Sequence, residues 1–133
     1  MEFTPYLNFD GTCAEAFRFY GEVFGGTPDI RTHGDSPIAD QVAPEWHDRV
    51  LHARLEVDGA VLMASDTPPD EYEPPRGTWV AIQLDDTVDA ERIFEALADG
   101  GRVTMPLEST FWAARFGMLV DRYGIAWMVS AGG

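Results

Sequence analysis

A pattern of residues that occurs twice constrains the fold of this chain more than any other feature of its sequence. Gly59, Met63 and Ser65 return as Gly124, Met128 and Ser130, each 65 positions further on (124 − 59). A second set of matches lies 75 positions apart (85 − 10) and pairs Asp10, Thr12, Phe19 and Gly25-Gly26 with Asp85, Thr87, Phe94 and Gly100-Gly101. A repeat of this length indicates two similar structural units, neither of which buries its core alone.

The first half of the chain is predicted to form a strand, a helix and three further strands. Phe3, Leu7 and Phe9 alternate with polar residues, which is typical of a half-buried strand. Thr12 and Glu15 have the spacing of a helix capping box, and Gly25-Gly26 ends the helix. The remainder is predicted as a weak strand (27–32), a long loop with a short helical turn (33–48) and a hairpin (50–65) that turns at Asp58-Gly59.

The second half repeats this order after a Pro-rich acidic connector at residues 66–77. A strand at 79–84, a helix with an apolar stripe over 90–98, a strand at 102–107 and a hairpin at 116–130 are expected. The predicted fold class is therefore α+β, with two βαβββ modules at about 1–66 and 78–131 in a single domain, 1–133. A helix on one face leaves the other face of each sheet open, so we expect Met63 and Met128 to face one shared cavity.

Charge and composition exclude several classes of partner. The chain has 23 acidic and 9 basic residues and a net charge of −14, which repels nucleic acid and anionic membranes but tolerates a cationic or neutral ligand. No signal-peptide pattern and no apolar run of about 18 residues is present, so a cytoplasmic location is expected. The single cysteine, Cys13, excludes an intramolecular disulfide and a cysteine-rich zinc site, and its place in an apolar stripe favours a buried, inert thiol.

Several motifs carry a resemblance to a known family. They are Pro5-Tyr6-Leu7-x-Phe9-Asp10-Gly11, Phe19-Tyr20-x-x-Val23-Phe24-Gly25, Phe111-Trp112-x-x-Arg115-Phe116-Gly117 and Asp121-Arg122-Tyr123-Gly124-x-x-Trp127-Met128. With the paired modules, they make the chain resemble the vicinal oxygen chelate superfamily of glyoxalases, extradiol dioxygenases and bleomycin-resistance proteins, in its PhnB-like (3-demethylubiquinone methyltransferase-like) branch. The resemblance implies an incomplete-barrel cup with the helices on its outer face, and a homodimer. It does not fix a reaction, because this fold hosts several chemistries.

The resemblance also identifies where a metal-binding relative would carry its ligands. Those positions fall on Thr4, Met63, Trp79 and Met128 in this chain. None is a hard donor, and thioether sulfur suits Cu(I) rather than Zn, Fe, Mn or Ni. We therefore expect neither a divalent metal nor another cofactor. The two methionines either pack in the core or line an adaptable apolar pocket. Their paired occurrence with Trp79 across from them favours the pocket, and Thr4 is expected to line it as well.

A pocket for an organic ligand also needs a few polar or aromatic groups. The candidates are Tyr6, Asn8, His52, Gln83, Trp112 and Arg115. Two functions follow as hypotheses. The first is a metal-independent protein that binds a small, partly aromatic organic molecule in an apolar cavity. The alternative is a lyase or isomerase that uses His52 or a glutamate such as Glu56 as its base; a scaffold without any ligand is the third reading.

Overall fold

The computed structural model describes residues 1–132. The chain divides into two compact units, Met1–Glu73 and Pro74–Gly133. The division falls inside the acidic, Pro-rich connector predicted from the sequence.

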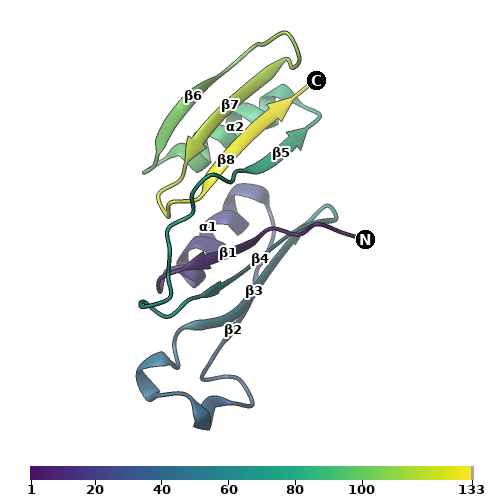
Figure 1. Ribbon diagram of the computed structural model, residues 1–133. Coiled ribbons are helices and arrows are strands. Elements are labelled where there is room, and N and C mark those ends of the chain that lie inside the picture. Colours follow the sequence, from purple (N-terminus) through teal and green to yellow (C-terminus); the bar gives the residue numbers. More distant parts are fainter. Residues whose placement is uncertain (133) are drawn as a thin grey trace. The chain divides into compact units, whose positions relative to one another are not determined.

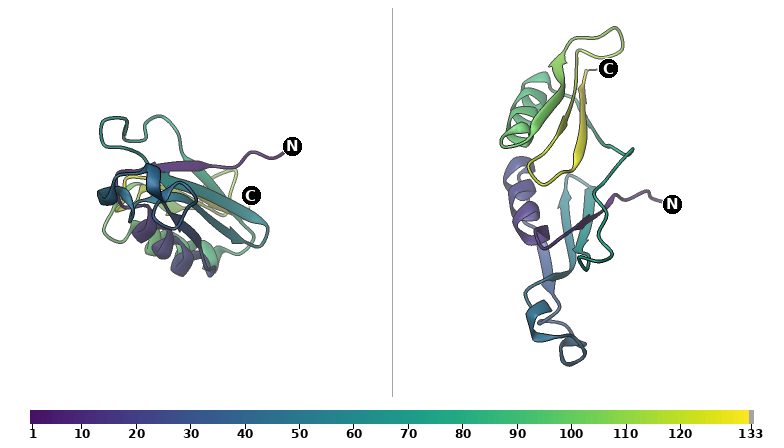
Figure 2. Two further views of the ribbon diagram at one scale, coloured as in Figure 1. Left: turned by 90° about the horizontal axis from the view of Figure 1, so that it is seen from below. Right: turned by 60° about the vertical axis from the view of Figure 1, so that its left-hand side comes forward.

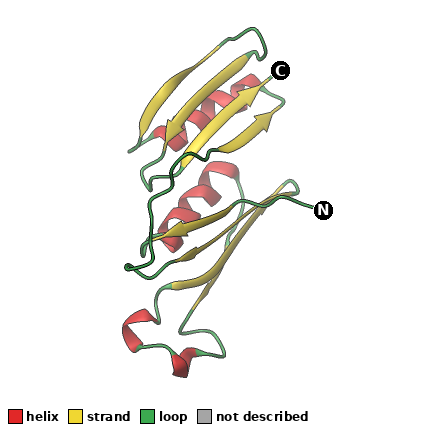
Figure 3. Ribbon diagram, viewed as in Figure 1, coloured by secondary structure: helices red, strands yellow, loops and turns green. Residues whose placement is uncertain are grey.

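The first unit is a four-stranded sheet with one long helix (Figure 1). Its elements are β1 (Tyr6–Phe9), α1 (Cys13–Phe24), β2 (Asp29–Thr32), the 3-10 turns η1 (Ala39–Gln41) and η2 (Pro44–Trp46), β3 (Val50–Val57) and β4 (Ala60–Asp66). The strand order is β1-β4-β3-β2, with β1 parallel to β4 and the other neighbours antiparallel. The two 3-10 turns, drawn as short red helices in Figure 3, lie in the predicted long loop.

The second unit has the same architecture. It contains β5 (Val80–Leu84), α2 (Thr87–Ala98), β6 (Arg102–Glu108), β7 (Arg115–Val120) and β8 (Ala126–Ala131). Its strand order, β5-β8-β7-β6, matches that of the first unit strand for strand, and β5 is again parallel to β8. The predicted α+β fold with two βαβββ units is confirmed, and both sheets are open rather than closed into a barrel.

Each helix covers one face of its own sheet (Figure 2). In α1, the residues at helical spacing Cys13, Ala16, Phe17 and Tyr20 are buried, as the sequence predicts, and the buried set ends at Val23 rather than the expected Phe24. In α2 the buried residues are Ala90, Ile93, Phe94 and Leu97. Apolar burial of these stripes is the main stabilising contribution of both helices.

Two expectations for the start of the chain are wrong. Phe3 is 94% exposed and precedes β1, because Pro5 cannot donate to a strand ladder and the strand begins only at Tyr6. The Thr12 hydroxyl makes no capping hydrogen bond to α1. The amide of Cys13 instead donates to the carboxylate of Asp66 at the end of β4, 3.1 Å away.

Both predicted hairpins are present. Asp58 and Gly59 connect β3 and β4 with positive φ values of 51° and 83°, as a tight turn requires. Between β7 and β8, the buried carboxylate of Asp121 accepts hydrogen bonds from the amides of Tyr123 and Ile125 at 2.8 and 3.0 Å. Its second oxygen accepts from the indole Nε1 of Trp127 at 2.8 Å, so one side chain holds the turn to the following strand. Within residues 1–132, none of the helices has the length and apolar character needed to cross a bilayer.

Candidate functional site

The sheet of the first unit has one face against α1 and one face without a helix, which we call the first open face. The α1 side is identified by Asp66, whose carboxylate accepts a hydrogen bond from the first residue of α1, and by the buried Ala53, Leu55 and Ala64. Because successive side chains of a strand point to opposite faces, the alternate positions lie on the first open face. These positions include four of the predicted ligand-pocket residues, namely Tyr6, Asn8, His52 and Met63.

Tyr6 and His52 form a polar pair on this face. The Tyr6 hydroxyl lies 3.4 Å from the His52 Nδ1, and the two ring centroids are 5.9 Å apart. Met63 on β4 is the cross-strand partner of Tyr6 on one side and of Arg54 on the other. Its strand therefore lies between β1, which carries Tyr6, and β3, which carries His52. The arrangement places a phenol, an imidazole and a thioether on one surface of the sheet.

A row of polar side chains crosses the first open face next to this pair. Asn8 is the register partner of Ser65, and Arg31 is the register partner of His52. His52 and Ser65 lie opposite each other by continuation of the Ala53–Ala64 pairing. All four members of the row carry hydrogen-bonding groups. The first open face is therefore polar along this row, and it presents hydrogen-bond donors and acceptors to its surroundings.

The corresponding face of the second unit, the second open face, combines amide and aromatic groups. The α2 side of this sheet is identified by Gly117, where an added Cβ would lie 2.7 Å from the ring of Phe94 on α2. The face opposite α2 carries Ser130 of β8 and its two register partners, Gln83 on β5 and Phe116 on β7. The Trp112 ring packs edge-on to Phe116, with centroids 5.4 Å apart, and contacts Phe111 at 4.7 Å. Trp112 is 50% exposed, so its indole is available to a ligand.

The side chain of Arg115 lies on the α2 side of its sheet rather than on the second open face. It shares the α2 side of β7 with Gly117, and its Nε is 3.3 Å from the carboxylate of Glu91 on α2. Its Nη1 also donates to the carbonyl oxygen of Ala114 at 2.8 Å. The alternation of β7 therefore directs this guanidinium towards α2 rather than towards the second open face, and its role as a pocket residue stays a prediction.

The four positions at which a metal-binding relative would carry its ligands do not fit a hard divalent cation. Thr4 and Trp79 are half-buried and precede β1 and β5, and Met63 and Met128 lie on the open faces of β4 and β8. A hydroxyl, an indole and two thioethers offer no carboxylate or imidazole ligand. Over residues 1–132, no group of three or more His, Cys, Asp and Glu side chains is arranged to hold a metal ion.

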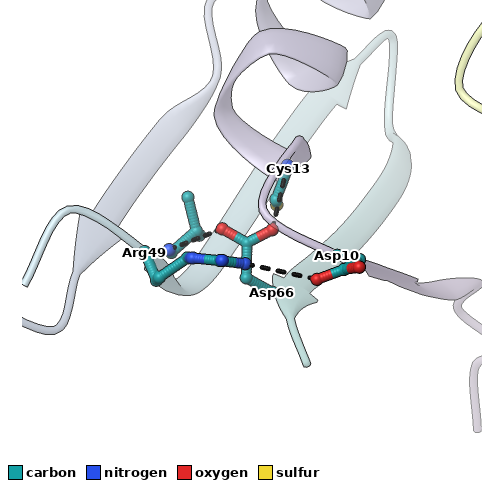
Figure 4. A network of polar contacts seen from close by, with 5 residues as sticks. Asp10, Cys13, Arg49 and Asp66 are labelled. Carbon is teal, nitrogen blue, oxygen red and sulfur yellow. Dashed lines mark hydrogen bonds and ion pairs between the residues drawn. The ribbon is translucent and has the colours of Figure 1, made fainter. Parts of the chain in front are cut away.

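The polar network around Asp66 is structural rather than a candidate site (Figure 4). Its buried carboxylate accepts from the amide of Cys13 and, at 2.9 Å, from that of Val50, so it joins β4 to α1 and β3. Nearby, Arg49 forms an ion pair with Asp10 at 3.5 Å. Burial raises the pKa of the Cys13 thiol well above its ordinary value, and the Asp66 carboxylate raises this pKa further. Burial of Cys13 agrees with the expectation from the sequence, and a raised pKa lowers the fraction of thiolate, which is the nucleophilic form.

Several residues of the two open faces were missed by sequence reasoning. Arg31 and Phe116 belong to strands whose register could not be read from one sequence, and their neighbours became visible only through strand pairing. Ser65 and Ser130 could have been found, because both belong to the repeated Gly-x-x-x-Met-x-Ser pattern. That Met63 and Met128 line one shared cavity stays a prediction.

Comparisons with known proteins agree with the fold and the repeat. The family model of the glyoxalase/bleomycin resistance protein/dioxygenase superfamily matches residues 5–129. The chain is 28% identical to protein YjdN of Escherichia coli strain K12, across 98% of this chain and 95% of that protein. Among solved structures, protein PA1353 from Pseudomonas aeruginosa has a TM-score of 0.90 at 46% identity, covering 99% of this chain and 98% of the other.

A PhnB protein from Bacillus cereus has the same fold, with a TM-score of 0.80 at 24% identity over 99% of this chain and 100% of that protein. The match to the family model extends across both βαβββ units, including the strands that carry Tyr6, His52, Met63 and Met128. The resemblance read from the sequence motifs is thereby confirmed: the chain belongs to the glyoxalase/bleomycin resistance protein/dioxygenase superfamily.

Proposed function

We propose that this protein binds a small, partly aromatic organic molecule on its first open face without using a divalent metal. The observation that carries the proposal is the composition of the first open face, where Tyr6, His52 and Met63 lie together beside the polar row of Asn8, Ser65 and Arg31. The tyrosine ring and the thioether supply apolar surface, and the neighbouring polar groups supply directional contacts, which are the two components of an organic-ligand site. The half-exposed Trp112 and its neighbour Phe116 extend the same chemistry to the second unit.

The charge of the protein supports a cationic or neutral ligand. With 23 acidic against 9 basic residues, the overall field raises the local concentration of cations and repels anions. On the first open face, Arg54 is neutralised by an ion pair with Glu56, so its positive charge opposes this field less. An aromatic cation is also suited to Trp112, since indole is the strongest of the cation–π partners.

A thermal-shift screen tests the proposal, using aromatic compounds in matched cationic, neutral and anionic forms. A compound present at 100 times its Kd adds about 2.7 kcal/mol to the free energy of unfolding. We expect cationic and neutral members to raise the melting temperature, and Tyr6→Phe to reduce that rise because it removes the hydroxyl facing His52. Tyr72→Phe, which makes the same change in the connector, is the matched control.

Elemental analysis of the purified protein accompanies the screen. We expect less than one equivalent of zinc, iron, manganese or nickel per chain, and ligand shifts that survive treatment with a chelator. A stoichiometric divalent metal, or a complete lack of shifts with all three classes of compound, would contradict the proposal.

An enzymatic function is the second candidate, and the Tyr6–His52 pair specifically favours it. An imidazole within 3.4 Å of a phenol can pass a proton between a substrate and the protein. In this reading His52 is the base of a lyase or isomerase and Tyr6 positions its ring. If a screen of enolisable carbonyl compounds finds turnover, we expect His52→Ala to abolish it; turnover that is unchanged in His52→Ala removes His52 from the mechanism.

A further inference from the structure

Three of the five methionines of this protein lie side by side on the second open face. Met128 on β8 is the register partner of Met118 on β7, and Met118 is in turn the register partner of Met105 on β6. Register partners on neighbouring strands point to the same face of a sheet. This face is the one opposite α2, because Gly117, next to Met118 in β7, faces Phe94 on α2. We call Met105, Met118 and Met128 the methionine row.

The three thioethers of the methionine row are within reach of one another. Side chains directly opposite on adjacent strands have Cβ atoms about 4.5–5.5 Å apart. A methionine side chain is unbranched and has three rotatable bonds, so its sulfur adjusts its position more readily than a branched group. The register of β6 is irregular on both sides of Met105, and irregularities of this kind re-aim side chains at the edge of a sheet. Three sulfur atoms can therefore converge above the central Met118.

The methionine row is also accessible from solvent. Met105 is 44% exposed, and Met118 and Met128 are half-buried. Met63 in the first unit differs, because its register partners are Tyr6 and Arg54 and neither carries sulfur. The repeat places a methionine at both equivalent positions, but only in the second unit do the neighbouring strands add two more thioethers.

We propose that the methionine row is a binding site for a soft monovalent cation, with Cu(I) as its metal. Thioether sulfur is a soft donor that selects Cu(I) over the hard and borderline divalent metals. The net charge of −14 attracts a cation to the protein. The thioethers are neutral ligands, so they bind the cation without releasing a proton. Binding involves no redox step, since the metal enters and remains as Cu(I). The proposal goes beyond the organic-ligand function and does not depend on it.

Anaerobic titration of the purified full-length chain with Cu(I), in competition with bicinchoninate, tests the proposal. We expect one Cu(I) per chain and a first coordination shell of sulfur alone in X-ray absorption spectra. Met118→Leu removes the central sulfur while keeping a side chain of similar volume, and we expect at least a tenfold loss of Cu(I) affinity. Met63→Leu makes the identical change in the first unit, and we expect the Cu(I) affinity to stay unchanged. Circular dichroism establishes that both variants are folded.

The pH dependence of the affinity provides a second readout. Thioethers carry no proton to displace, so the Cu(I) affinity is expected to be constant between pH 6 and 8, whereas imidazole and thiolate ligands lose affinity as the pH falls. Lack of competition with bicinchoninate would overturn the proposal. So would equal losses in Met118→Leu and Met63→Leu, or an affinity that declines with acid. Because the readout is the metal alone, none of these outcomes decides whether an organic ligand binds.

Discussion

Asp66 and Asp121 are acidic residues of the kind that a sequence reader assigns to solvated turns, yet both are buried. Each accepts backbone hydrogen bonds from two residues, and Asp121 also accepts from the indole of Trp127. The role of Asp121 is local, within six residues, and its motif indicated a hairpin. The role of Asp66 was not predictable, because its partner Cys13 is 53 positions away and only the folded chain brings them together. The predicted Thr12 cap failed for the same reason.

The first prediction concerns Asp66. In Asp66→Asn, one of the two carboxylate oxygens becomes an amide that faces a backbone N–H donor, so a buried hydrogen bond is lost. We expect the free energy of unfolding to fall by about 1–3 kcal/mol. Urea denaturation measures it. Asp10→Asn is the matched control, since its partly exposed ion pair with Arg49 contributes about 0–1 kcal/mol. Equal effects of the two substitutions would contradict the structural role of Asp66.

The second prediction concerns Cys13 and pH. Burial raises the folded-state pKa of this thiol, so the folded chain retains a proton that the unfolded chain releases above about pH 8.5. The stabilising contribution is fully present below that pH and is lost as the pH rises towards the folded-state pKa, by about 1.4 kcal/mol per pH unit. Urea denaturation at pH 8 and pH 10 should show a steeper loss for the natural chain than for Cys13→Ala. Parallel losses would show that the thiol ionises equally in both states.

At the scale of elements, the sequence predicts best where the signal is local. Both helices and both hairpins follow from periodicity, glycine positions and turn residues, and the single helical turn expected in the long loop is present as two 3-10 turns. The expected start of β1 was wrong, because Pro5 delays the strand to Tyr6. The position of Arg115 on the α2 side could not be predicted, because it depends on packing outside β7. The alternation of side chains along β7 can be read from the sequence. The face of the sheet that α2 covers cannot, because it is set by the packing of the helix.

The third prediction compares two glycines at the ends of elements. Gly101 precedes β6, and an added Cβ would clash with the carbonyl oxygen of Val120 and lie 2.9 Å from the Cα of Asp121. Gly124, in the β7–β8 turn, has φ of 87° and open space around the added atom. We expect Gly101→Ala to cost about 3 kcal/mol through backbone overlap and Gly124→Ala about 1–2 kcal/mol through φ strain alone. Chemical denaturation ranks the two; the reverse order would show that the backbone near Val120 yields easily.

At the scale of the whole molecule, the internal repeat predicted the architecture of both units. The strand orders β1-β4-β3-β2 and β5-β8-β7-β6 are the same, and the boundary between units falls in the acidic connector. The composition of the open faces was harder to predict, since it depends on strand register. The polar row of the first unit and the methionine row of the second both arise from pairings between residues distant in sequence.

The fourth prediction follows from the net charge of −14. Self-repulsion of this charge destabilises the compact state, and added salt screens it. Raising the ionic strength from about 0.01 M to 0.15 M shortens the Debye length from about 30 Å to about 8 Å. We expect a higher melting temperature with NaCl at pH 7, and a smaller increase at pH 5, where more carboxylates are protonated. A melting temperature that falls with salt at pH 7 would show that ion pairs such as Arg122–Asp99 outweigh the repulsion.

The parallel pairing of β1 with β4, and of β5 with β8, sets the order in which the molecule can assemble as it is synthesised. The first strand of each unit, β1 or β5, can pair only after β4 or β8 has left the ribosome. The β3–β4 and β7–β8 hairpins can form as soon as they emerge. A nascent chain stalled before Ala60 thus holds β1 without β4, its neighbour in the sheet. The sheet of each unit is therefore complete only after its last strand in sheet contact with the first, β4 or β8, has been synthesised.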